Sequence, residues 1–277
     1  MRLDLHLHST ASDGRLSPEE LVKTAGRLGL AAIAITDHDS VDGIDSALKA
    51  AVSYPSLQVI PGVEVSTDVP HGEVHILGYF IDHANPELTI KLAAFRNSRK
   101  VRAQKMIAKL ATMGVQIEWG RVQDIAGTGS VGRPHIAQAM LEEGYVPSMK
   151  EAFDRYIGRE APAYAEREKM MPEEVVELIT RVGGLAVLAH PAEVHDLEHL
   201  IPRLQRVGLM GLEVYYNNYT LKTTQYLASL AHKHALVATG GSDFHGMDSA
   251  TETPIGGVVI PPECIDRLLA LNKRRSQ

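Results

Sequence analysis

Short apolar segments that end in histidine or carboxylate side chains recur along this chain and limit the folds open to it. The first, residues 3–7, alternates leucine with polar residues, and it carries His6 with His8 just after it. Alternation of period two is typical of a β-strand, in which His6 and His8 point to the same side. Asp13 follows in a short polar loop, from which its carboxylate can fold back over the strand end. Taken alone, the segment is compatible with solvated polar residues or with a metal-chelating edge.

Strand-like and helix-like segments alternate over most of the chain. The segment 17–20 has a serine cap, a proline at the first helical position and two glutamates, which together predict a helix start. We expect strands near 3–8 and at 31–36, 57–66, 73–80, 185–189, 212–215 and 236–239. We expect helices at 18–28, 43–52, 172–181, 197–207, 221–234 and 262–272. Seven strands, mostly with intervening helices, predict an α/β barrel.

The strand signals stop in the middle of the chain. One long helix is expected over 86–114, and shorter helical pieces separated by Gly and Pro follow it. We therefore predict a barrel formed by residues 1–99 and 172–277. Residues 100–171 are predicted to form a small inserted helical domain that caps the substrate site.

The composition narrows the class of protein. No run of about 18 apolar residues is present to span a bilayer, and the charged amino-terminal strand lacks the features of a signal peptide. We therefore expect a cytoplasmic protein without a membrane partner. The single cysteine, Cys264, can form no internal disulfide, and the net charge of −6 argues against a general nucleic-acid coat protein. The 13 histidines are the one unusual feature, and histidine is a common ligand of catalytic metals.

Nine metal-competent side chains lie where the predicted strands finish. In a closed α/β barrel the carboxyl ends of the strands open on one face, so these residues should converge. Nine ligands suit two or three divalent cations. Because the set has imidazoles and carboxylates but no thiolate, Mn²⁺ is the expected ion, with Zn²⁺ or Fe²⁺ as alternatives. The predicted ligands are His6, His8, Asp13, His38, Glu64, His75, His190, Asp243 and His245.

The order and spacing of these residues resemble the motif series of the PHP (polymerase and histidinol phosphatase) family. The motifs are His6-x-His8, Thr36-Asp37-His38, Gly62-x-Glu64, His75, Ala189-His190-Pro191 and Ser242-Asp243-x-His245. The resemblance covers residues 1–98 and 172–277, and every ligand position of the pattern is filled. It implies a distorted (β/α)7 barrel, related to the amidohydrolase superfamily, with a trinuclear metal centre that hydrolyses phosphoesters.

The resemblance also implies how the ligands are divided among three ions. One ion would be held by His6, His8, Glu64 and Asp243. Glu64 and His75 would hold the second with another shared group. Asp13, His38, His190 and His245 would be divided with the third. Which residue bridges which pair of ions stays open.

Basic residues in and beside the predicted insertion are candidate substrate contacts. Arg99 and Arg102 share one face of the long helix, where they could clamp a phosphate or form a solvated basic surface. Arg133 and His135 flank Pro134 at a helix start, where backbone amides favour an anion. The predicted substrate contacts are Arg99, Arg102, Arg133, Pro134, His135 and Lys169.

Within the family, the compact insertion and these basic segments resemble the subgroup that acts on nucleotides. We therefore expect a metal-dependent phosphatase that removes the 3′-phosphate of 3′,5′-bisphosphonucleosides, converting pAp to AMP and phosphate. A metal-bridging hydroxide held by Glu64 would attack phosphorus in line. Asp13, His38 and His195 are candidates for proton transfer or substrate contact.

Four alternatives remain. The chain could be a 5′–3′ exonuclease on short oligonucleotides, a histidinol-phosphate-type phosphatase, a carbon–nitrogen hydrolase of the wider superfamily, or a metal-stabilised binding module without turnover. Many arginines near the expected pocket disfavour the carbon–nitrogen hydrolase, and the complete ligand set disfavours the inert module. The expected partner is a small phosphorylated nucleotide or a short oligonucleotide, and no protein partner is inferred.

Overall fold

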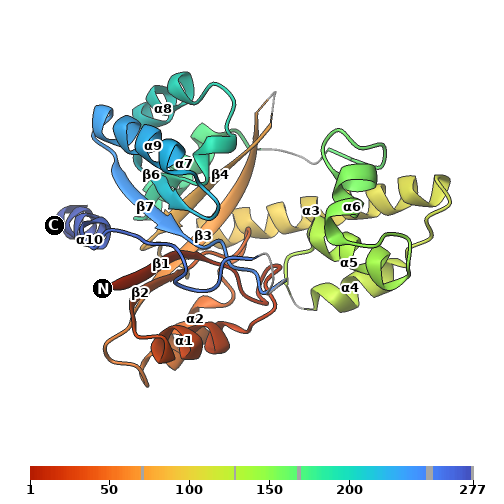
Figure 1. Cartoon of the computed structure of the whole chain (residues 1–277), viewed down its shortest axis with the longest axis horizontal. Coiled ribbons are helices and arrows are strands. Elements are labelled where there is room, and N and C mark those ends of the chain that lie inside the picture. The colour runs from red at the N-terminus through yellow and green to blue at the C-terminus, as the bar shows by residue number, and fades with distance from the viewer. Residues whose placement is uncertain (70–71, 128, 167–169, 248–251, 276–277) are drawn as a thin grey trace.

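The computed structural model describes residues 1–69, 72–127, 129–166, 170–247 and 252–275 of the 277-residue chain. Within these residues, seven strands form one sheet whose spatial order follows the chain. The strands are β1 (Arg2–Leu7), β2 (Leu30–Ile35), β3 (Gln58–Val69), β4 (Gly72–Tyr79), β5 (Leu185–Leu188), β6 (Leu209–Tyr216) and β7 (Val237–Gly241). Figure 1 shows the sheet curled, with helices around it.

The two edges of the sheet meet at β1 and β7. Leu7, the last residue of β1, forms a parallel bridge with Phe244, which lies just beyond the end of β7. The Asp243 N–H donates to His6 O at 3.0 Å, and the His8 N–H donates to Phe244 O at 3.0 Å. The sheet is therefore a nearly closed barrel, and the predicted fold class is confirmed.

One strand runs against the others. β4 is antiparallel to both β3 and β5, whereas all the other neighbouring pairs are parallel. The expectation that His75 lies where a strand finishes is therefore wrong, because His75 lies in the first half of β4, paired with Ser66 of β3. A short hairpin can join only antiparallel strands. The reversal brings the early part of β4 to the face where the other strands end.

Helices cover the outside of the barrel. They are α1 (Pro18–Arg27), α2 (Ile44–Ala51), α7 (Pro172–Arg181), α8 (Leu197–Arg206), α9 (Leu221–Lys233) and α10 (Glu263–Arg275). α1 and α2 lie on one side, and α7, α8 and α9 on the other (Figure 1). Ser17 caps α1 as predicted: its hydroxyl accepts from the Glu20 N–H at 3.2 Å, and the Glu20 carboxylate accepts from the Ser17 N–H at 2.8 Å. Cys264 of α10 is buried against the barrel.

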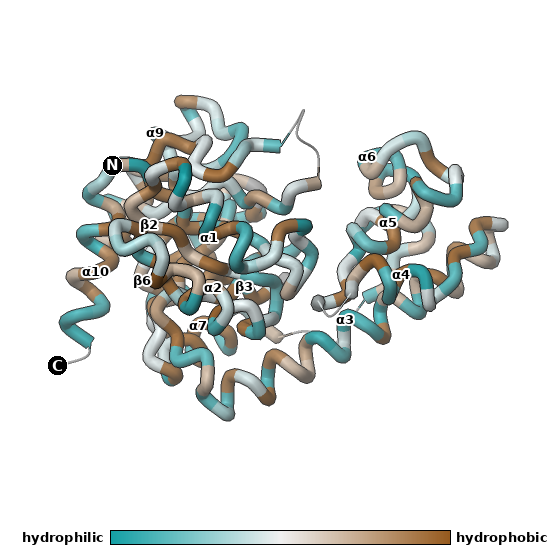
Figure 2. The backbone as a smooth tube through the Cα atoms, turned by 90° about the horizontal axis from the view of Figure 1, so that it is seen from below, coloured by the Kyte–Doolittle hydropathy of each residue, from teal (hydrophilic) through white to brown (hydrophobic). Residues whose placement is uncertain are grey.

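The middle of the chain is helical. It contains α3 (Pro86–Thr112), α4 (Trp119–Ala126), α5 (Arg133–Glu142), α6 (Met149–Ala152) and the π-helix η1 (Phe153–Ile157). α3 is one continuous helix that joins two hydrophobic clusters. Its Leu88 and Leu92 pack into the barrel cluster, whereas Met106 and Leu110 pack with residues of α4, α5 and η1. Figure 2 shows the same arrangement, with the shorter helices set along the far half of α3.

The predicted boundary between residues 99 and 100 falls inside α3, between these two clusters. The division into two domains stays a prediction. Among the described residues, no helix is both long and apolar enough to cross a membrane.

Gly241, at the end of β7, tests the closure of the barrel. A Cβ at this position would lie 2.3 Å from the His6 Cβ and 2.5 Å from the His6 backbone nitrogen. Because backbone atoms cannot move aside without displacing β1, we expect Gly241→Ala to lower the free energy of unfolding by about 1–3 kcal/mol. Urea denaturation measures this change.

Gly120 provides the matched control. It lies in α4, and a Cβ there would meet nothing within 4 Å. Gly120→Ala should leave the stability unchanged or raise it by about 0.5–1 kcal/mol. A Gly241→Ala protein as stable as the original would contradict the close approach of β1 and β7.

Candidate metal centre

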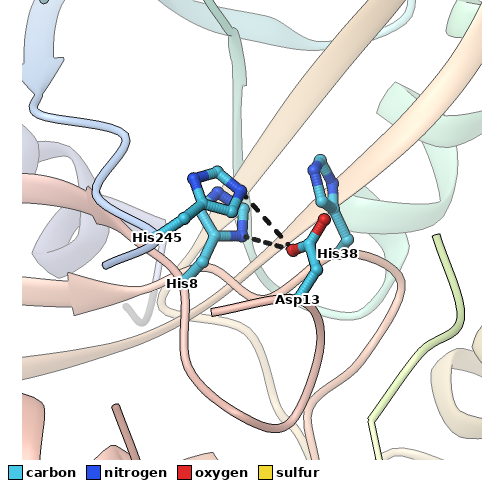
Figure 3. Close-up of side chains that lie close together, drawn as sticks. All are labelled: His8, Asp13, His38 and His245. Carbon is cyan, nitrogen blue, oxygen red and sulfur yellow. Dashed lines mark ion pairs between the residues drawn. The ribbon is translucent and has the colours of Figure 1, made fainter. Parts of the chain in front are cut away.

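The predicted metal ligands converge at the face where the parallel strands end. Eight of the nine fall into three overlapping groups, and within each group the donor atoms lie within 4.8 Å of one another. The groups are His8, Asp13, His38 and His245; His6, His8, Glu64 and Asp243; and His38, Glu64 and His75. Figure 3 shows the first group, in which Asp13 faces two of the histidines. His8, His38 and Glu64 each belong to two groups and link the three.

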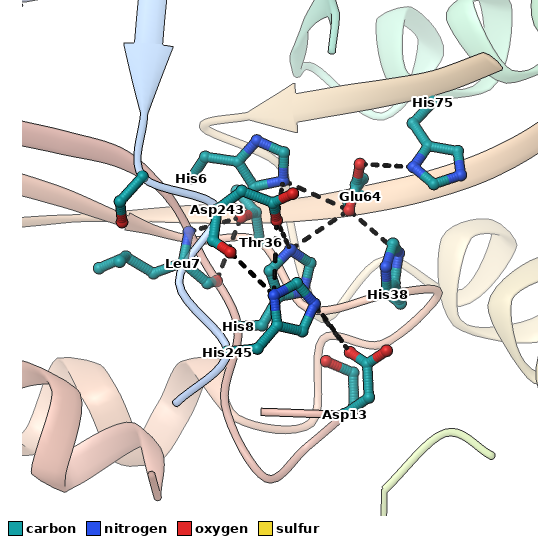
Figure 4. Close-up of polar contacts among 12 residues, drawn as sticks. His6, Leu7, His8, Asp13, Thr36, His38, Glu64, His75, Asp243 and His245 are labelled. Carbon is teal, nitrogen blue, oxygen red and sulfur yellow. Dashed lines mark hydrogen bonds and ion pairs between the residues drawn. The ribbon is translucent and has the colours of Figure 1, made fainter. Parts of the chain in front are cut away.

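Glu64 lies at the centre of the cluster and is almost completely buried. Its Oε2 lies 3.3 Å from Nε2 of both His6 and His8, and 3.0 Å from Nδ1 of His38. Its Oε1 lies 2.8 Å from Nδ1 of His75 (Figure 4). One carboxylate therefore faces imidazole nitrogens from several strands and loops.

His190, the ninth predicted ligand, also reaches Glu64. Its Nε2 lies 3.2 Å from Glu64 Oε1 and 3.1 Å from His75 Nδ1. Thus the structure brings all nine predicted ligands to one cluster, with His190 and His75 on the Oε1 side of Glu64.

The donor atoms fit a metal centre because many of them are buried without a hydrogen bond. They include His6 Nε2, both ring nitrogens of His8, His38 Nδ1 and Glu64 Oε2. Each buried polar atom without a hydrogen-bond partner lowers the stability of the folded protein by about 1–3 kcal/mol. Most buried polar atoms therefore have a partner, and a group of unpaired ones indicates a site for a ligand. Asp13 Oδ1 and Asp243 Oδ1 belong to the same set.

The spacing of these atoms agrees with shared coordination. Asp243 Oδ1 lies 3.3 Å from His6 Nε2 and 3.0 Å from His8 Nε2. Two ligands bound about 2.1 Å from one ion, at octahedral or tetrahedral angles, lie about 3.0–3.4 Å apart. These residues can therefore hold divalent ions without large movement.

The charges in the cluster keep its carboxylates ionised. Burial opposes ionisation of Asp13, but His38 and His245 hold its pKa well below the usual range. Burial likewise opposes ionisation of Glu64, and neighbouring histidines, His38 first among them, lower its pKa well below the usual value. Burial lowers the pKa of His38 to about 3, although Glu64 and Asp13 act to raise it.

Two buried aspartates shape the loops that carry ligands. Asp37 accepts hydrogen bonds from the Ser9 N–H and hydroxyl, each at 2.7 Å, and from the Ser12 hydroxyl at 2.6 Å, next to Asp13. Asp4 accepts from the Ser242 N–H at 2.9 Å and from its hydroxyl at 2.6 Å. The hydrogen bonds between Asp4 and Ser242 hold the turn at the next residue, Asp243, whose φ is +54°.

A small pocket joins the cluster to four of the six predicted substrate residues. It has a volume of about 140 Å³ and is lined by His38, His75, His245, Asp13, Ser66, Glu73, Arg99, Arg102, Arg133, Pro134 and Phe153. Arg99 and Arg102 are only 6% and 5% exposed, so the alternative of a solvated basic surface is wrong. Arg99 pairs with Asp39 and donates to Ser66 Oγ at 2.7 Å.

Glu73 is the shared counter-charge of the other two arginines. Its carboxylate lies 2.7 Å from Arg133 Nη2 and 3.8 Å from Arg102 Nη1. Arg133 is the first residue of α5, as the sequence predicted. The arginines thus come from α3 and α5, whereas their acidic partners come from the barrel.

The other predicted contacts are not brought into this pocket. His135 is buried, its Nδ1 accepts the Gly132 N–H at 2.9 Å, and it lines a neighbouring pocket instead. His195 is exposed on the turn before α8, outside the three ligand groups. Lys169 lies outside the described residues.

Two residues that contact the cluster were not predicted from the sequence. Glu213 lies 2.9 Å from His6 Nδ1, and the Tyr216 hydroxyl donates to Asp243 Oδ2 at 2.7 Å. Burial, with the nearby carboxylates, raises the pKa of Tyr216 and keeps it a donor. An acidic residue inside the apolar strand 209–216 was the signal that could have revealed Glu213.

His8→Ala tests the metal centre. His8 belongs to two ligand groups and both its ring nitrogens are buried without a hydrogen bond. Removing the ring should lower the number of tightly bound divalent ions, because no neighbouring side chain can replace its donors. Elemental analysis after dialysis measures the loss.

His83→Ala is the control for this variant. His83 pairs with Asp45 at 2.9 Å on α2, away from the cluster. Its replacement should leave the metal content unchanged. If His8→Ala kept as much metal as His83→Ala, the proposed ligand groups would be wrong.

Comparison with known proteins was made for the sequence and for the fold. The family model described as PHP domain matches residues 4–157. The chain is 33% identical to the 3′,5′-nucleoside bisphosphate phosphatase of Chromobacterium violaceum over 268 residues, which cover 95% of this chain and 93% of that protein. It is 35% identical to the 5′–3′ exoribonuclease Rnm of Salmonella typhimurium over 87% of this chain and 84% of that protein.

Among solved structures, the chain is similar to a protein of Bifidobacterium adolescentis described as a candidate metal-dependent phosphoesterase. The TM-score is 0.87 at 28% identity, over 97% of this chain and 95% of the other.

Proposed function

Because the chain belongs to the PHP domain family, we propose that it removes the 3′-phosphate from 3′,5′-bisphosphonucleosides, converting pAp to AMP and phosphate. The coarser activity is metal-dependent hydrolysis of a phosphoester, in agreement with relatives named as a phosphatase and an exoribonuclease and with a solved structure described as a metal-dependent phosphoesterase. The observation that carries the finer proposal is the pocket in which arginine side chains stand beside the ligand cluster.

The ligand groups would hold two or three divalent ions, with Mn²⁺ as the proposed metal and Zn²⁺ or Fe²⁺ as alternatives. His6, His8, Glu64 and Asp243 would hold one ion, and Asp13, His38, His75, His190 and His245 would complete the others. Bound ions would lower the pKa of water and neutralise charge on phosphoryl oxygens.

The arginines would bind and orient the phosphate. Arg99 is held by Asp39 and Ser66 of the barrel, so its guanidinium is already ordered before substrate arrives. Arg133 has a second support, since its guanidinium lies over the rings of Phe153 and Tyr164, 5.7 and 5.8 Å from their centres. Ordered donors lose little entropy on binding and can stabilise charge as it develops.

The size of the pocket limits what enters it. Sites for whole small molecules occupy about 300–1,000 Å³, whereas this pocket has about 140 Å³. It can accept a phosphoryl group, and the nucleoside would lie outside it. Arg133, Pro134 and Phe153 contribute to its wall from the helical region, which supports the proposed capping role of residues 100–171.

A second candidate is a 5′–3′ exonuclease acting on short oligonucleotides. It is supported by the similarity to the Salmonella enzyme, which is as close in identity as the phosphatase. A pocket that takes one phosphoryl group and leaves the nucleoside outside suits a chain end as well as a mononucleotide.

Phosphate release separates these candidates. Protein loaded with Mn²⁺ should convert pAp to 5′-AMP and phosphate faster than it degrades 5′-phosphorylated di- to pentanucleotides. Faster release of mononucleotides from the oligonucleotides would favour the exonuclease. Turnover of histidinol phosphate with pAp and the oligonucleotides untouched would refute both, and inert metal-loaded protein would indicate a binding module.

Arg133→Ala tests the arginine contact. Loss of a charge-assisted hydrogen bond to phosphate should lower kcat/KM for pAp by about 10- to 100-fold while the metal content stays the same. Arg155→Ala is the matched control, because Arg155 belongs to the same helical region but pairs with Glu151 at the surface. Equal loss in the two variants would argue against a phosphate contact at Arg133.

A further inference from the structure

Strand β6 contains a bulge beside the ligand cluster. Glu213 pairs with Thr239 of β7, but Tyr215, two residues later, pairs with Gly240, only one residue later. In a regular strand, residues three apart point to opposite faces. The extra residue changes this alternation. As a result, Glu213 and Tyr216 lie toward the same side, and both contact ligands of the cluster.

Glu213 is completely buried, and both of its carboxylate oxygens are used. Oε1 lies 2.9 Å from Nδ1 of His6, and Oε2 accepts the backbone N–H of His190 at 2.7 Å. His6 comes from β1, whereas His190 follows β5. One side chain of β6 therefore holds two candidate ligands that come from different strands.

The contact with His6 determines which ring nitrogen can coordinate. A carboxylate oxygen only accepts, so Nδ1 carries a proton, and Nε2 is the ring nitrogen left to coordinate an ion. That Nε2 lies 3.3 Å from both Glu64 Oε2 and Asp243 Oδ1 and makes no hydrogen bond. With the opposite tautomer, an N–H would point at the place where an ion is needed.

The contact with His190 supports a turn that its backbone would otherwise avoid. His190 has φ +26° and ψ 55°, close to the left-handed region that is unfavourable for most residues other than glycine. The hydrogen bond from its N–H to Glu213 holds this turn, and the turn directs the His190 ring to Glu64.

We infer that Glu213 is a positioning residue of the metal centre: it fixes the tautomer of His6 and the turn at His190, and so sets the affinity for the ions. The inference rests on the proposed function only in requiring that the site bind divalent metal. Partners that orient a metal-bound histidine typically change metal affinity by about 10- to 100-fold when they are removed.

Glu213→Gln tests this role with little change in shape. Separate oxygens of Glu213 face His6 and His190, whereas an amide has an acceptor oxygen at one of these positions and a donor NH2 at the other, so it cannot accept at both. We expect isothermal titration of metal-free protein with Mn²⁺ to show at least one class of sites weakened by about 10- to 100-fold, with occupancy restored at correspondingly higher Mn²⁺.

Tyr79→Phe provides the matched control. Tyr79 is also completely buried in the barrel, and its hydroxyl donates to Leu5 O at 2.8 Å, a backbone atom outside the ligand set. This variant should lose stability yet bind Mn²⁺ like the original protein. If Glu213→Gln behaved in the same way, Glu213 would be a structural residue only and the inference would be overturned.

A second measurement needs no variant. In the original protein loaded with Zn²⁺, the ¹⁵N chemical shifts of the His6 ring should report a protonated Nδ1 and an unprotonated Nε2, and the opposite tautomer would overturn the inference.

Failure of the proposed function is distinguishable from failure of this inference. Protein that leaves pAp intact but loses Mn²⁺ affinity on Glu213→Gln would refute the substrate and support Glu213. Protein that binds no Mn²⁺ would refute both.

Discussion

Three ionised carboxylates, two of them buried and the third partly buried, gather at one end of the barrel, and much of the structure serves to make this possible. Asp13, Glu64 and Asp243 would repel one another and lose their hydration if they stood alone. Imidazole rings surround them instead, at 2.8–3.9 Å. The loops that bring these rings together are tied by further buried hydrogen bonds. A site assembled in this way is stable when cations share its lone pairs.

The elements of the fold were largely predictable because each is determined by neighbouring residues. The serine cap and the acidic first turn mark α1, and the apolar run at 31–36 marks β2. The direction of β4 was not considered, since it depends on the short connection to β3 rather than on the composition of the strand. His75 lies in the ligand cluster, although its predicted position at the end of a strand was wrong.

The candidate site was predictable to the extent that its chemistry depends on residue type. Histidine and carboxylate after apolar segments are rare enough to stand out. The burial of Arg99 could not be predicted, because its partner Asp39 lies sixty residues away in sequence. Tyr216 was missed for a similar reason: the bulge after Glu213 changes the face to which Tyr216 points, and a bulge is visible only when two strands are paired. Whether the substrate is a mononucleotide or an oligonucleotide depends on the space outside the pocket. The residue types in the sequence do not describe that space.

The long helix α3 is attached to the barrel over its first half and carries the smaller helices on its second half. Its first half packs on the barrel, and Arg99 and Arg102 attach its middle to Asp39 and Glu73 through buried ion pairs. A rotation of the smaller helices must therefore bend α3 beyond Arg102 or break these pairs. Substitutions at the distal end of α3 can therefore shift α5, and Arg133 with it, while Arg99 and Arg102 keep their place beside the ligand cluster.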